Sequence, residues 1–280
     1  MMTLRSMYQF TARDLALLSQ LVRQRIGLHF APEKYDLLAE KLAPLLSERG
    51  MDSFLDYYYY LKYDPQGEAE WEQIEQALTV NETYFWREFG ALRVAAEKLV
   101  PDLQRDRPDT PVRIWHAACA SGEEPYSMAI ALTEKARFLY GEVDILGTDI
   151  NRHALRQAEA GVYARRSFRS IPPDILEKYF EPLGSGSFRL LSSIMRRVRF
   201  AYCNLVDARA VQAQGVFDII FCRNVWIYFD EETVTRVARN LYHALHPGGY
   251  VAVGAAESLL RYPQWFQPCE IDDVFLYRRV

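Results

Sequence analysis

Polar residues that could bind a small molecule follow three short hydrophobic runs in the second half of the sequence. The first run ends in a turn of small residues that closes on Glu123 and Glu124. Asp149 follows the second run, and Arg223 follows a later one. Because α/β sheets bind their ligands at the carboxyl ends of the strands, these residues are expected to meet at one edge of a sheet. Carboxylates in that place favour a ligand with cationic or hydroxyl groups.

The first of these turns, residues 116–125, lacks the glycine pattern of a dinucleotide-binding loop. It contains one glycine, Gly122, and the two acids that begin the next helix would repel a pyrophosphate. Small residues let a ligand come close to the backbone, but they also allow tight packing between a strand and a helix, and both interpretations stay open. His116 begins this turn, and a hydrogen-bonded structural role is favoured for it over the role of a base.

The other two strand ends carry a carboxylate and a guanidinium. Asp149 stands where a carboxylate can accept both hydroxyl groups of a ribose. The alternative is a helix N-cap, because a helix is predicted directly after it. Arg223 and Asn224 follow a run that is almost entirely apolar, and a charge in that place is explained more readily by a binding site than by packing.

The elements before residue 105 are predicted to be helical. Thr11 and Asp14 resemble a capping box, and apolar residues recur at helical spacing up to Ile26. A second helix is predicted from Pro32, with Gly50 at its end. Further helices are predicted over residues 54–61, 68–78 and 91–103. The four consecutive tyrosines at 57–60 cannot all face one core.

The second half of the chain alternates β-rich runs with amphipathic helices, which is typical of an α/β sheet with crossover helices. Strands are predicted over residues 112–115, 143–146, 198–202, 217–221 and 250–253. Helices are predicted over residues 124–139, 152–160 and 231–245, and residues 246–249 are predicted to form a turn.

Residues 161–198 interrupt this alternation and are too many for an ordinary loop. They contain two prolines, a short helical run with the sequence DILEKYF and a Gly-Ser-Gly turn at 184–186. We expect an inserted subdomain with a small antiparallel sheet. The predicted domains are a helical N-terminal domain at 1–87, a linker helix and loop at 88–111, and a doubly wound α/β domain at 112–280.

Composition and charge exclude several classes of protein. Half of the 280 residues are hydrophobic and 25% are charged, which is typical of a globular protein. A net charge of −4 gives no basic excess for binding phosphates, so no nucleic-acid partner is expected. The cysteines are too far apart in sequence for a metal site or a disulfide framework, and no metal is expected. They are Cys119, Cys203, Cys222 and Cys269.

The location of the protein is also predicted from the sequence. The first residues lack the apolar core of a signal peptide, and no apolar run approaches the roughly 20 residues that cross a bilayer. We expect a cytoplasmic protein without direct membrane insertion, and a monomer.

Five segments resemble, in order and separation, the motifs of the CheR-type chemotaxis receptor methyltransferases. They are NETYFWRE at 81–88, ACASGEEPYS at 118–127, GTDI at 147–150, FDIIFCRNVWIYFD at 217–230 and HPGG at 246–249. The resemblance covers nearly the whole chain, including an all-helical N-terminal domain and an inserted β-subdomain. It implies the doubly wound, mostly parallel α/β sheet of the methyltransferases that use S-adenosylmethionine (SAM).

The resemblance also implies a reaction and its partners. A methyl group would pass from SAM to glutamate side chains on the cytoplasmic signalling helices of chemoreceptors, which gives glutamate methyl ester and S-adenosylhomocysteine. This reaction serves adaptation in chemotaxis-type signalling. In some members of the family the inserted subdomain binds a peptide from the receptor C-terminus as an added strand. Arg165, Arg166 and Arg169 would meet an acidic peptide here or only solvate a loop, and the loop is favoured.

Carried over by motif, the resemblance implies which residues hold the cofactor. One group would meet its methionine and sulfonium end and another its amino group, ribose and adenine. The implied cofactor-binding residues are Asn81, Thr83, Arg87, Glu124, Asp149, Asn204, Leu205, Arg223 and Asn224. Arg87 and Tyr228 are the candidate catalytic residues, since a guanidinium fork and a phenol can both orient a carboxylate. Trp86 is interpreted as packing at a domain interface.

Three other functions remain as alternatives. The first is an adaptor that binds SAM without catalysis, which the presence of Arg87 and Tyr228 disfavours. The second is a methyltransferase with an unrelated substrate, which would not need the N-terminal domain or the insertion. The third is a nicotinamide-dependent dehydrogenase, which the missing glycine pattern disfavours. The second helix also offers few of the basic residues with which family members dock a receptor, so the docking face is expected to differ.

Overall fold

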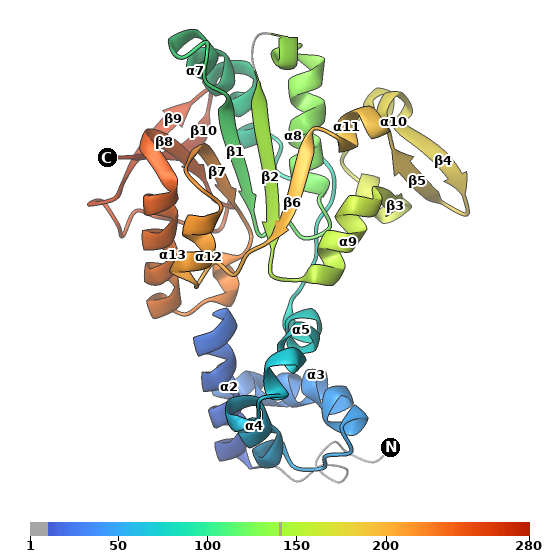
Figure 1. Ribbon diagram of the computed structural model, residues 1–280. Coiled ribbons are helices and arrows are strands. Elements are labelled where there is room, and N and C mark those ends of the chain that lie inside the picture. Colours follow the sequence, from blue (N-terminus) through green and yellow to red (C-terminus); the bar gives the residue numbers. More distant parts are fainter. Residues whose placement is uncertain (1–10, 140–141) are drawn as a thin grey trace. The chain divides into compact units, whose positions relative to one another are not determined.

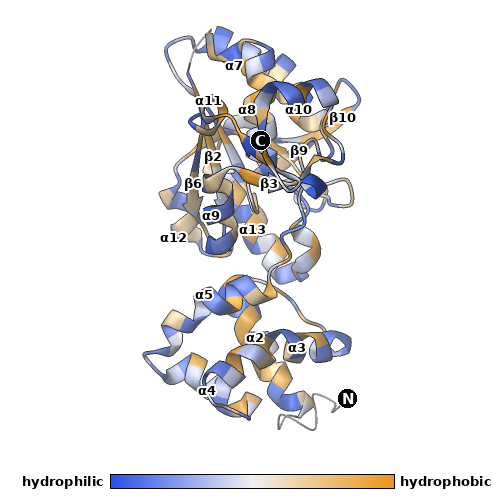
Figure 2. Cartoon of the chain, turned by 90° about the vertical axis from the view of Figure 1, so that its right-hand side faces the viewer, coloured by the Kyte–Doolittle hydropathy of each residue, from blue (hydrophilic) through white to orange (hydrophobic). Residues whose placement is uncertain are grey.

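The computed structural model describes residues 11–139 and 142–280 (Figure 1). These residues form two compact units. The first contains the described residues up to Val80 together with Tyr228–Arg236, and the second contains Asn81–Ile227 and Val237–Val280. Hydrophobic residues, orange in Figure 2, alternate with hydrophilic ones along the helices of both units. Within the described ranges, no helix is both long enough and apolar enough to cross a membrane.

The first unit is helical, as the periodicity predicts. Its elements are α2 (Ala12–Ile26), the 3₁₀ turn η1 (Pro32–Lys34), α3 (Tyr35–Glu48), α4 (Phe54–Tyr63) and α5 (Gly67–Leu78). The capping box is confirmed, because the Thr11 hydroxyl accepts the Asp14 N–H while the Asp14 carboxylate accepts the Thr11 N–H at 2.7 Å. Gly27 ends α2 with a φ of +84°, a left-handed conformation that glycine adopts without strain.

The four consecutive tyrosines of α4 divide between the core and the surface. Tyr57 and Tyr58 are buried, whereas Tyr59 is 51% exposed. The Tyr57 hydroxyl donates a hydrogen bond of 3.0 Å to Glu70, a buried carboxylate on α5. Burial together with this negative charge raises the pKa of Tyr57. The expectation that these rings cannot all face one core is confirmed.

A segment from the second half of the chain, Tyr228–Arg236, completes the first unit. The His29 N–H donates to the Tyr228 carbonyl at 2.9 Å, and Leu28 forms an isolated bridge with Phe229. Arg23 pairs with Asp230 at 2.7 Å. Burial alone would raise the pKa of Asp230, but hydrogen bonds from Thr233 and Arg23 outweigh it and lower the pKa to about 2. A charged pair therefore attaches this returning segment to α2.

This attachment can be measured with a double-mutant cycle of Arg23→Met and Asp230→Asn. Asparagine keeps an oxygen for the Thr233 N–H, so the cycle isolates the ion pair. We expect a coupling of about 1–2 kcal/mol in the free energy of urea unfolding, because both side chains are mostly buried. Glu48→Gln, at an exposed position, is the control and should change that free energy by less than about 0.5 kcal/mol. If the effects of the two single substitutions on the free energy of unfolding simply add in the double variant, the ion pair would be contradicted.

The second unit contains a long helix with a π-helical turn in its middle. It consists of α6 (Gly90–Val94), the π-helical turn η2 (Ala95–Leu99) and α7 (Val100–Asp106). The helix predicted at 91–103 is therefore confirmed, and the polar loop after it begins at Arg107. Its inner face contributes Leu92, Ala95 and Leu99 to the core of this unit.

A seven-stranded sheet forms the centre of the second unit as it is described, in the order β6-β2-β1-β7-β8-β10-β9 (Figure 1). The strands are β1 (Val112–Ala117), β2 (Val143–Asp149), β6 (Val198–Tyr202), β7 (Phe217–Cys222), β8 (Leu245–Ala252), β9 (Phe266–Ile271) and β10 (Val274–Arg279). The first five in this order are parallel, and β10 is antiparallel to both of its neighbours. The predicted doubly wound, mostly parallel sheet is confirmed, but β9 and β10 were not predicted.

The central strands align their apolar residues. Ile114 of β1 is the register partner of Ile145 on one side and of Ile219 on the other. All three side chains are at most 1% exposed. Parallel strands that are covered on both faces read as continuous apolar runs, which is why the alternation of runs and helices predicted them.

Helices connect the parallel strands. They are α8 (Glu123–Glu134), the 3₁₀ turn η3 (Arg137–Leu139), α9 (Arg152–Ala160), α12 (Ala208–Ala213), the 3₁₀ turn η5 (Trp226–Tyr228) and α13 (Glu231–Ala244). Asn151 and Asp207 cap α9 and α12 with their side chains. The segment His246–Gly249, predicted as a turn before a strand, is instead the irregular first part of β8, where the pairing with β7 shifts register after Phe217.

The predicted insertion forms a separate sheet beside the central one (Figure 1). Its elements are β3 (Val162–Ala164), η4 (Arg165–Phe168), α10 (Pro173–Tyr179), β4 (Phe180–Gly184), β5 (Ser187–Leu190) and α11 (Ser192–Met195). The strand order is β3-β5-β4, and both pairings are antiparallel, as expected. Gly184, Ser185 and Gly186 all have positive φ, which confirms the turn between β4 and β5.

Candidate functional site

The carboxyl ends of the five parallel strands lie at one edge of the central sheet. Sheet order places the ends of β6, β2, β1, β7 and β8 next to one another. Asp149 is the last residue of β2, and Asn204, the turn after β1, Arg223 and Gly254 follow the ends of the other four strands. The expectation that the polar residues at the strand ends meet at one edge of the sheet is therefore confirmed.

The turn after β1 is held in an unusual backbone conformation. Ala118, Ala120 and Gly122 have φ values of +62°, +49° and +88°. The Ala120 N–H donates to Asp149 at 2.8 Å, which fixes this turn against the end of β2. A Cβ on Gly122 would lie 2.7 Å from the Cβ of Ala158, so the glycine is required by packing between elements. The small residues of this turn could serve either ligand approach or tight packing, and tight packing is observed at Gly122.

Asp149 is a buried carboxylate whose oxygens accept backbone N–H groups. Besides the bond from Ala120, its Oδ1 accepts the Asn151 N–H at 2.8 Å. Burial raises its pKa, and the backbone hydrogen bonds oppose the rise. The cap of α9 is Asn151, so the alternative of a helix N-cap at Asp149 is wrong. Its role in holding a ribose stays a prediction.

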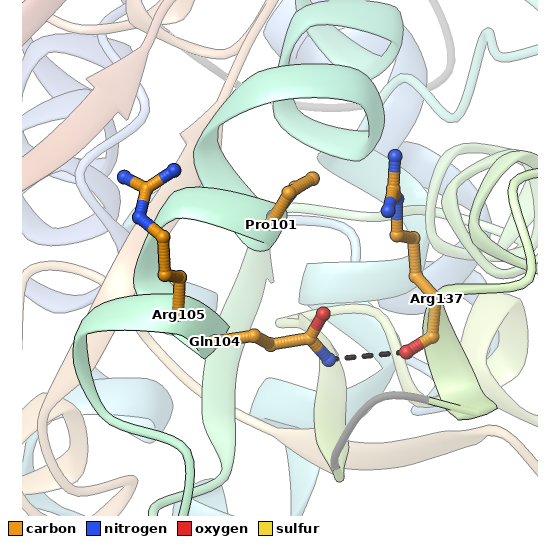
Figure 3. Close-up of a pocket in the computed structure, with 4 residues that line it drawn as sticks. All are labelled: Pro101, Gln104, Arg105 and Arg137. Carbon is orange, nitrogen blue, oxygen red and sulfur yellow. Dashed lines mark hydrogen bonds between the residues drawn. The ribbon is translucent and has the colours of Figure 1, made fainter.

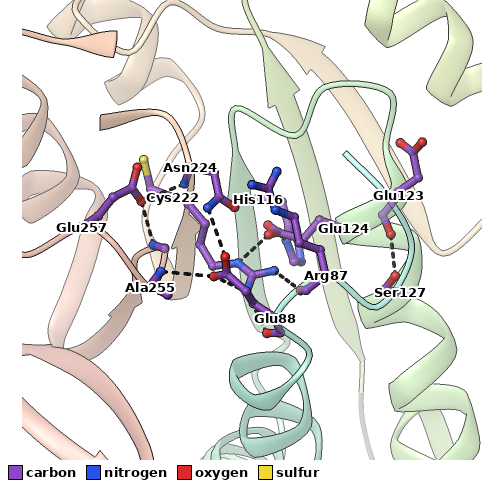
Figure 4. Close-up of polar contacts among 12 residues, drawn as sticks. Arg87, Glu88, His116, Glu123, Glu124, Ser127, Cys222, Asn224, Ala255 and Glu257 are labelled. Carbon is purple, nitrogen blue, oxygen red and sulfur yellow. Dashed lines mark hydrogen bonds and ion pairs between the residues drawn. The ribbon is translucent and has the colours of Figure 1, made fainter. Parts of the chain in front are cut away.

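Glu124 lies at the centre of a buried polar network (Figure 4). Its Oε2 accepts the Nε–H of Arg223 at 2.6 Å, and its Oε1 is 2.7 Å from Nδ1 of His116. Burial alone would raise the pKa of Glu124, but the charge of Arg223 and the hydrogen bonds outweigh it and lower the pKa to about 2. Burial lowers the pKa of His116, so the neutral imidazole is the form that this network favours. The structural role expected for His116 agrees with this position.

Arg223 joins this network to a distant segment of the chain. Its side chain is only 2% exposed. Nη1 and Nη2 donate to the carbonyls of Glu88 and Arg87 at 2.9 and 3.0 Å. The segment 81–89, which precedes α6 in sequence, is thereby attached to the end of β7.

The segment 81–89 is anchored by Phe85. Its side chain is fully buried and lies against the rings of Tyr163, Phe168 and Phe180 from the inserted subdomain. Its N–H donates to the Ser167 carbonyl at 2.9 Å. This part of the chain, which periodicity alone would predict to be a helix end, is thus an ordered connection between the insertion and the strand ends.

The residues that flank Arg87 have strained backbones. Trp86 and Glu88 have φ values of +65° and +46°, which L-residues rarely adopt and which cost about 1–2 kcal/mol each. The Trp86 N–H donates to Ser127 at 3.2 Å, and its ring stacks on Phe89. These contacts all lie within the second unit, and the expected role of Trp86 at a domain interface stays a prediction.

Arg87 itself is half-exposed at the edge of this segment. Its Nη1 donates to the Glu82 carbonyl at 2.8 Å, and its guanidinium lies 5.7 Å from the ring centre of Tyr84. Arg169 packs on the same ring and pairs with the Glu82 carboxylate at 2.9 Å. Arg169 thus has partners within this unit, and whether it meets a peptide stays a prediction.

Besides Arg87, two predicted cofactor residues lie on this segment, and two follow β6. Asn81 is exposed and Thr83 is half-buried. Oδ1 of Asn204 accepts the Val206 N–H at 3.2 Å, and the Leu205 carbonyl accepts a bond from Asn240 on α13. The structure thus places these predicted residues on ordered loops, while their contacts with a cofactor stay predictions.

Tyr228 belongs to the first unit, where its carbonyl accepts the His29 N–H. It lies at the end of η5, directly before the segment that Asp230 attaches to α2. Its catalytic role therefore stays a prediction.

Glu123 does not share the environment of Glu124, although both were expected to face an ammonium group. Its carboxylate accepts hydrogen bonds from Ser121 at 2.7 Å and from Ser167 at 3.0 Å. Figure 4 shows it pointing away from the network of Glu124. Consecutive residues of a helix point about 100° apart, which explains why the two carboxylates have different partners. A contact of Glu123 with an ammonium group therefore stays a prediction.

Sequence reasoning missed two carboxylates at this edge. Glu88 accepts hydrogen bonds from Nδ2 of Asn224 and from the Ala255 N–H. Glu257 accepts bonds from the backbone of the loop after β7. Both residues could have been suspected, because Glu88 closes the first recognised motif and Glu257 follows the end of a predicted strand by four residues.

A surface pocket lies away from this edge. It has a volume of about 260 Å³ and is lined by Pro101, Gln104, Arg105 and Arg137 (Figure 3). Gln104 donates to the Arg137 carbonyl at 3.0 Å. Since α7 leads into the amino end of β1, the pocket is at the other end of the sheet from the polar network.

Comparison with known proteins identifies the family. Residues 81–275 match the model described as "CheR methyltransferase, SAM binding domain", and residues 13–79 match "CheR methyltransferase, all-alpha domain". "Chemotaxis protein methyltransferase 2" of Vibrio cholerae is 36% identical over 239 residues, which cover 85% of this chain and 83% of that protein. "Chemotaxis protein methyltransferase 1" of Pseudomonas aeruginosa is 31% identical over 270 residues, which cover 95% and 97%.

The chain is therefore a methyltransferase with a SAM-binding domain and belongs to the CheR family. This confirms the resemblance drawn from the five motifs, and SAM is the cofactor. The side chains at the strand ends fit the chemistry of SAM, which carries an ammonium group, a carboxylate and ribose hydroxyls. Glu124 keeps 15% of its side chain exposed beside Arg223, and Arg87 is half-exposed on the attached segment.

The Glu124 network predicts a specific dependence of stability on pH. At pH 7, Glu124→Gln should lower the free energy of unfolding by about 3 kcal/mol, because it breaks a buried ion pair. Since the pKa of Glu124 is about 2 in the folded protein and about 4.3 when unfolded, its stabilisation is complete above pH 4.3 and is lost as the pH falls towards 2. The difference between wild type and variant should therefore shrink below about pH 4.5 in urea unfolding.

Glu270→Gln is the control for this experiment, because Glu270 is exposed on β9. It should leave the unfolding free energy nearly unchanged at every pH. A difference for Glu124→Gln that stays constant from pH 7 to pH 3 would be inconsistent with an ionised Glu124 of low pKa.

Proposed function

We propose that this enzyme methylates glutamate side chains of chemoreceptors and produces glutamate methyl ester and S-adenosylhomocysteine. The relatives are named chemotaxis protein methyltransferases and match most of the chain, which supports this substrate class. The observation that carries the proposal is the attachment of Arg87 and its neighbours to the SAM-binding edge through Arg223. A cation on that segment is available to a carboxylate acceptor.

The cofactor would be held by residues from separate strand ends and from segment 81–89. Glu124 would bind the ammonium group and Asp149 the ribose, with Asn204 and Leu205 beside the adenine. Arg223 and Asn224 would close the site, and Asn81, Thr83 and Arg87 would meet the methionine and sulfonium end. When bound, SAM supplies a methyl group that its positive sulfonium makes electrophilic.

The protein groups in this proposal orient the acceptor and need not deprotonate it. A glutamate side chain has a reference pKa of about 4.3 and is ionised near neutral pH, so a strong general base is not required. The guanidinium of Arg87 holds a carboxylate oxygen in line with the methyl group, and Tyr228 is the second candidate for this task. The buried ring of Phe85 and the bonds from Arg223 keep this segment in one position, which preserves alignment.

The proposed partner is the cytoplasmic signalling helix of a chemoreceptor, and the proposed location is the cytoplasm. A receptor C-terminal peptide is a possible second contact. The outer strands of the small sheet, β3 and β4, each pair with β5 on one side only in the described sheet, so a peptide strand has an edge to join. We expect neither nucleic acid nor direct membrane insertion, and a monomeric enzyme.

Arg87→Ala tests the proposed reaction. Labelled methyl groups from SAM are offered to receptor-bearing membranes, and mild alkali then releases methyl esters as volatile methanol. The wild-type enzyme should give alkali-labile label on the receptor. Arg87→Ala should lower turnover by about 10³-fold, because the acceptor carboxylate loses its orientation, while the melting temperature stays unchanged.

Arg209→Ala, at an exposed position on α12, is the matched control and should retain full activity. Alkali-stable label would indicate a different acceptor atom. If the protein binds SAM but labels none of several receptors, the alternative of a SAM-binding adaptor without catalysis would be favoured. An active Arg87→Ala enzyme would remove Arg87 from the mechanism.

A further inference from the structure

Glu257 is a carboxylate that none of the proposed cofactor contacts uses, and it connects the ends of two neighbouring strands. It follows β8 in the sequence Gly254-Ala-Ala-Glu257. Its Oε2 accepts the N–H groups of Asn224 and Gly254, both at 2.7 Å. Its Oε1 accepts the Trp226 N–H at 2.9 Å. One side chain thus satisfies three backbone donors, two from the loop after β7 and one from the end of β8.

The loop after β7 requires such support, because its backbone is unusual. Asn224 has a φ of +60°, in the left-handed region that asparagine tolerates but does not prefer. Its N–H and that of Trp226 point to the carboxylate of Glu257. Buried N–H groups without an acceptor are costly, so this carboxylate stabilises the conformation in which Asn224 directs its side chain to Glu88 at 3.2 Å.

The strand ends approach each other closely at this point. A Cβ on Gly254 would lie 2.7 Å from Nδ2 of Asn224 and 2.7 Å from Oε2 of Glu257. Any larger residue would have to displace these two side chains. The glycine and the carboxylate therefore act together to set the position of Asn224 relative to the sheet.

The charge of Glu257 is also balanced by the backbone. Burial raises its pKa and the nearby negative charge of Glu88 adds to the rise, whereas the three N–H groups lower it. Glu88 in turn lies 3.7 Å from Arg223. The carboxylate of Glu257 is thus part of the same polar network that holds segment 81–89, although none of the recognised motifs includes Glu257.

We propose that Glu257 is a positioning residue for cofactor binding. It fixes the backbone of Asn224 and Trp226 against β8, and it thereby holds Asn224 and the adjacent Arg223 in the arrangement that receives SAM. The inference rests on the proposed placement of the cofactor at these two residues. It does not depend on which acceptor is methylated.

Glu257→Gln and Glu257→Ala test this role by calorimetric titration of the full-length protein with S-adenosylhomocysteine. The glutamine oxygen can keep the bonds at Oε2, but its NH₂ group faces the Trp226 N–H, so one bond is lost. We expect the dissociation constant to rise about tenfold for glutamine and about 100-fold for alanine. Glu270→Gln, exposed on β9, is the control and should bind like wild type.

A second readout separates positioning from a purely structural role. At saturating SAM, the kcat of Glu257→Gln should stay within about twofold of wild type while the KM for SAM rises, because Phe85 still anchors segment 81–89 and Arg87 keeps its contacts with Glu82 and Tyr84. Wild-type dissociation constants for both folded variants, with only a lower unfolding midpoint, would overturn the proposal. A loss confined to kcat would overturn it as well.

The experiment also distinguishes this inference from the proposed function. If the wild-type protein binds S-adenosylhomocysteine but methylates no receptor, the acceptor is wrong and the Glu257 variants still report on cofactor binding. If Glu257→Ala does not fold, the isosteric glutamine variant carries the test.

Discussion

The buried guanidinium of Arg223 is the interaction on which the rest of the site depends. A charge that is only 2% exposed must be paired and hydrogen-bonded, since an unpaired one would cost several kcal/mol. Its partners come from two other parts of the chain: the Glu124 carboxylate at the start of α8, and the carbonyls of Arg87 and Glu88. Three segments that are far apart in sequence are therefore fixed by one side chain.

Several residues in the segments around Arg223 adopt rare backbone conformations. Trp86, Glu88, Ala118, Ala120 and Asn224 all have positive φ, and they lie in segment 81–89 or in the turns after β1 and β7. Strain of this kind persists only where surrounding contacts determine the backbone. Here the contacts are the carboxylates of Asp149 and Glu257, which accept backbone N–H groups from the turns after β1, β7 and β8. The edge of the sheet is thus held ready for a ligand.

The sequence predicted the parallel strands well, because covered parallel strands read as apolar runs between helices. It did not predict β9 and β10, since the exposed positions of β9 mix polar residues with Pro268 and lack a clear alternation. The side-chain partners were harder still. Glu123 and Glu124 are adjacent and chemically alike, yet the helix turns them to different sides, so composition could not tell which one faces Arg223.

Other parts of the site could not be predicted because they depend on tertiary contacts. The motif at 81–88 was recognised by resemblance, but nothing in its periodicity shows that its carbonyls bond to Arg223, more than 130 residues later. Glu257 was missed because its partners are backbone N–H groups, which carry no side-chain pattern, and its place after a predicted strand was a weak signal. The HPGG segment illustrates the opposite error, since a sequence typical of a turn is included in β8 through an irregular pairing with β7.

The dissociation constant of SAM for Arg223 variants tests the central claim most directly. Arg223→Lys keeps a positive charge but loses the planar fork that reaches Glu124 and two carbonyls, and Arg223→Met removes the charge. Isothermal titration with the folded variants, checked by circular dichroism, should show affinity about 100-fold weaker for methionine and clearly weaker for lysine. Wild-type affinity in both folded variants would contradict the claim that this guanidinium assembles the SAM site.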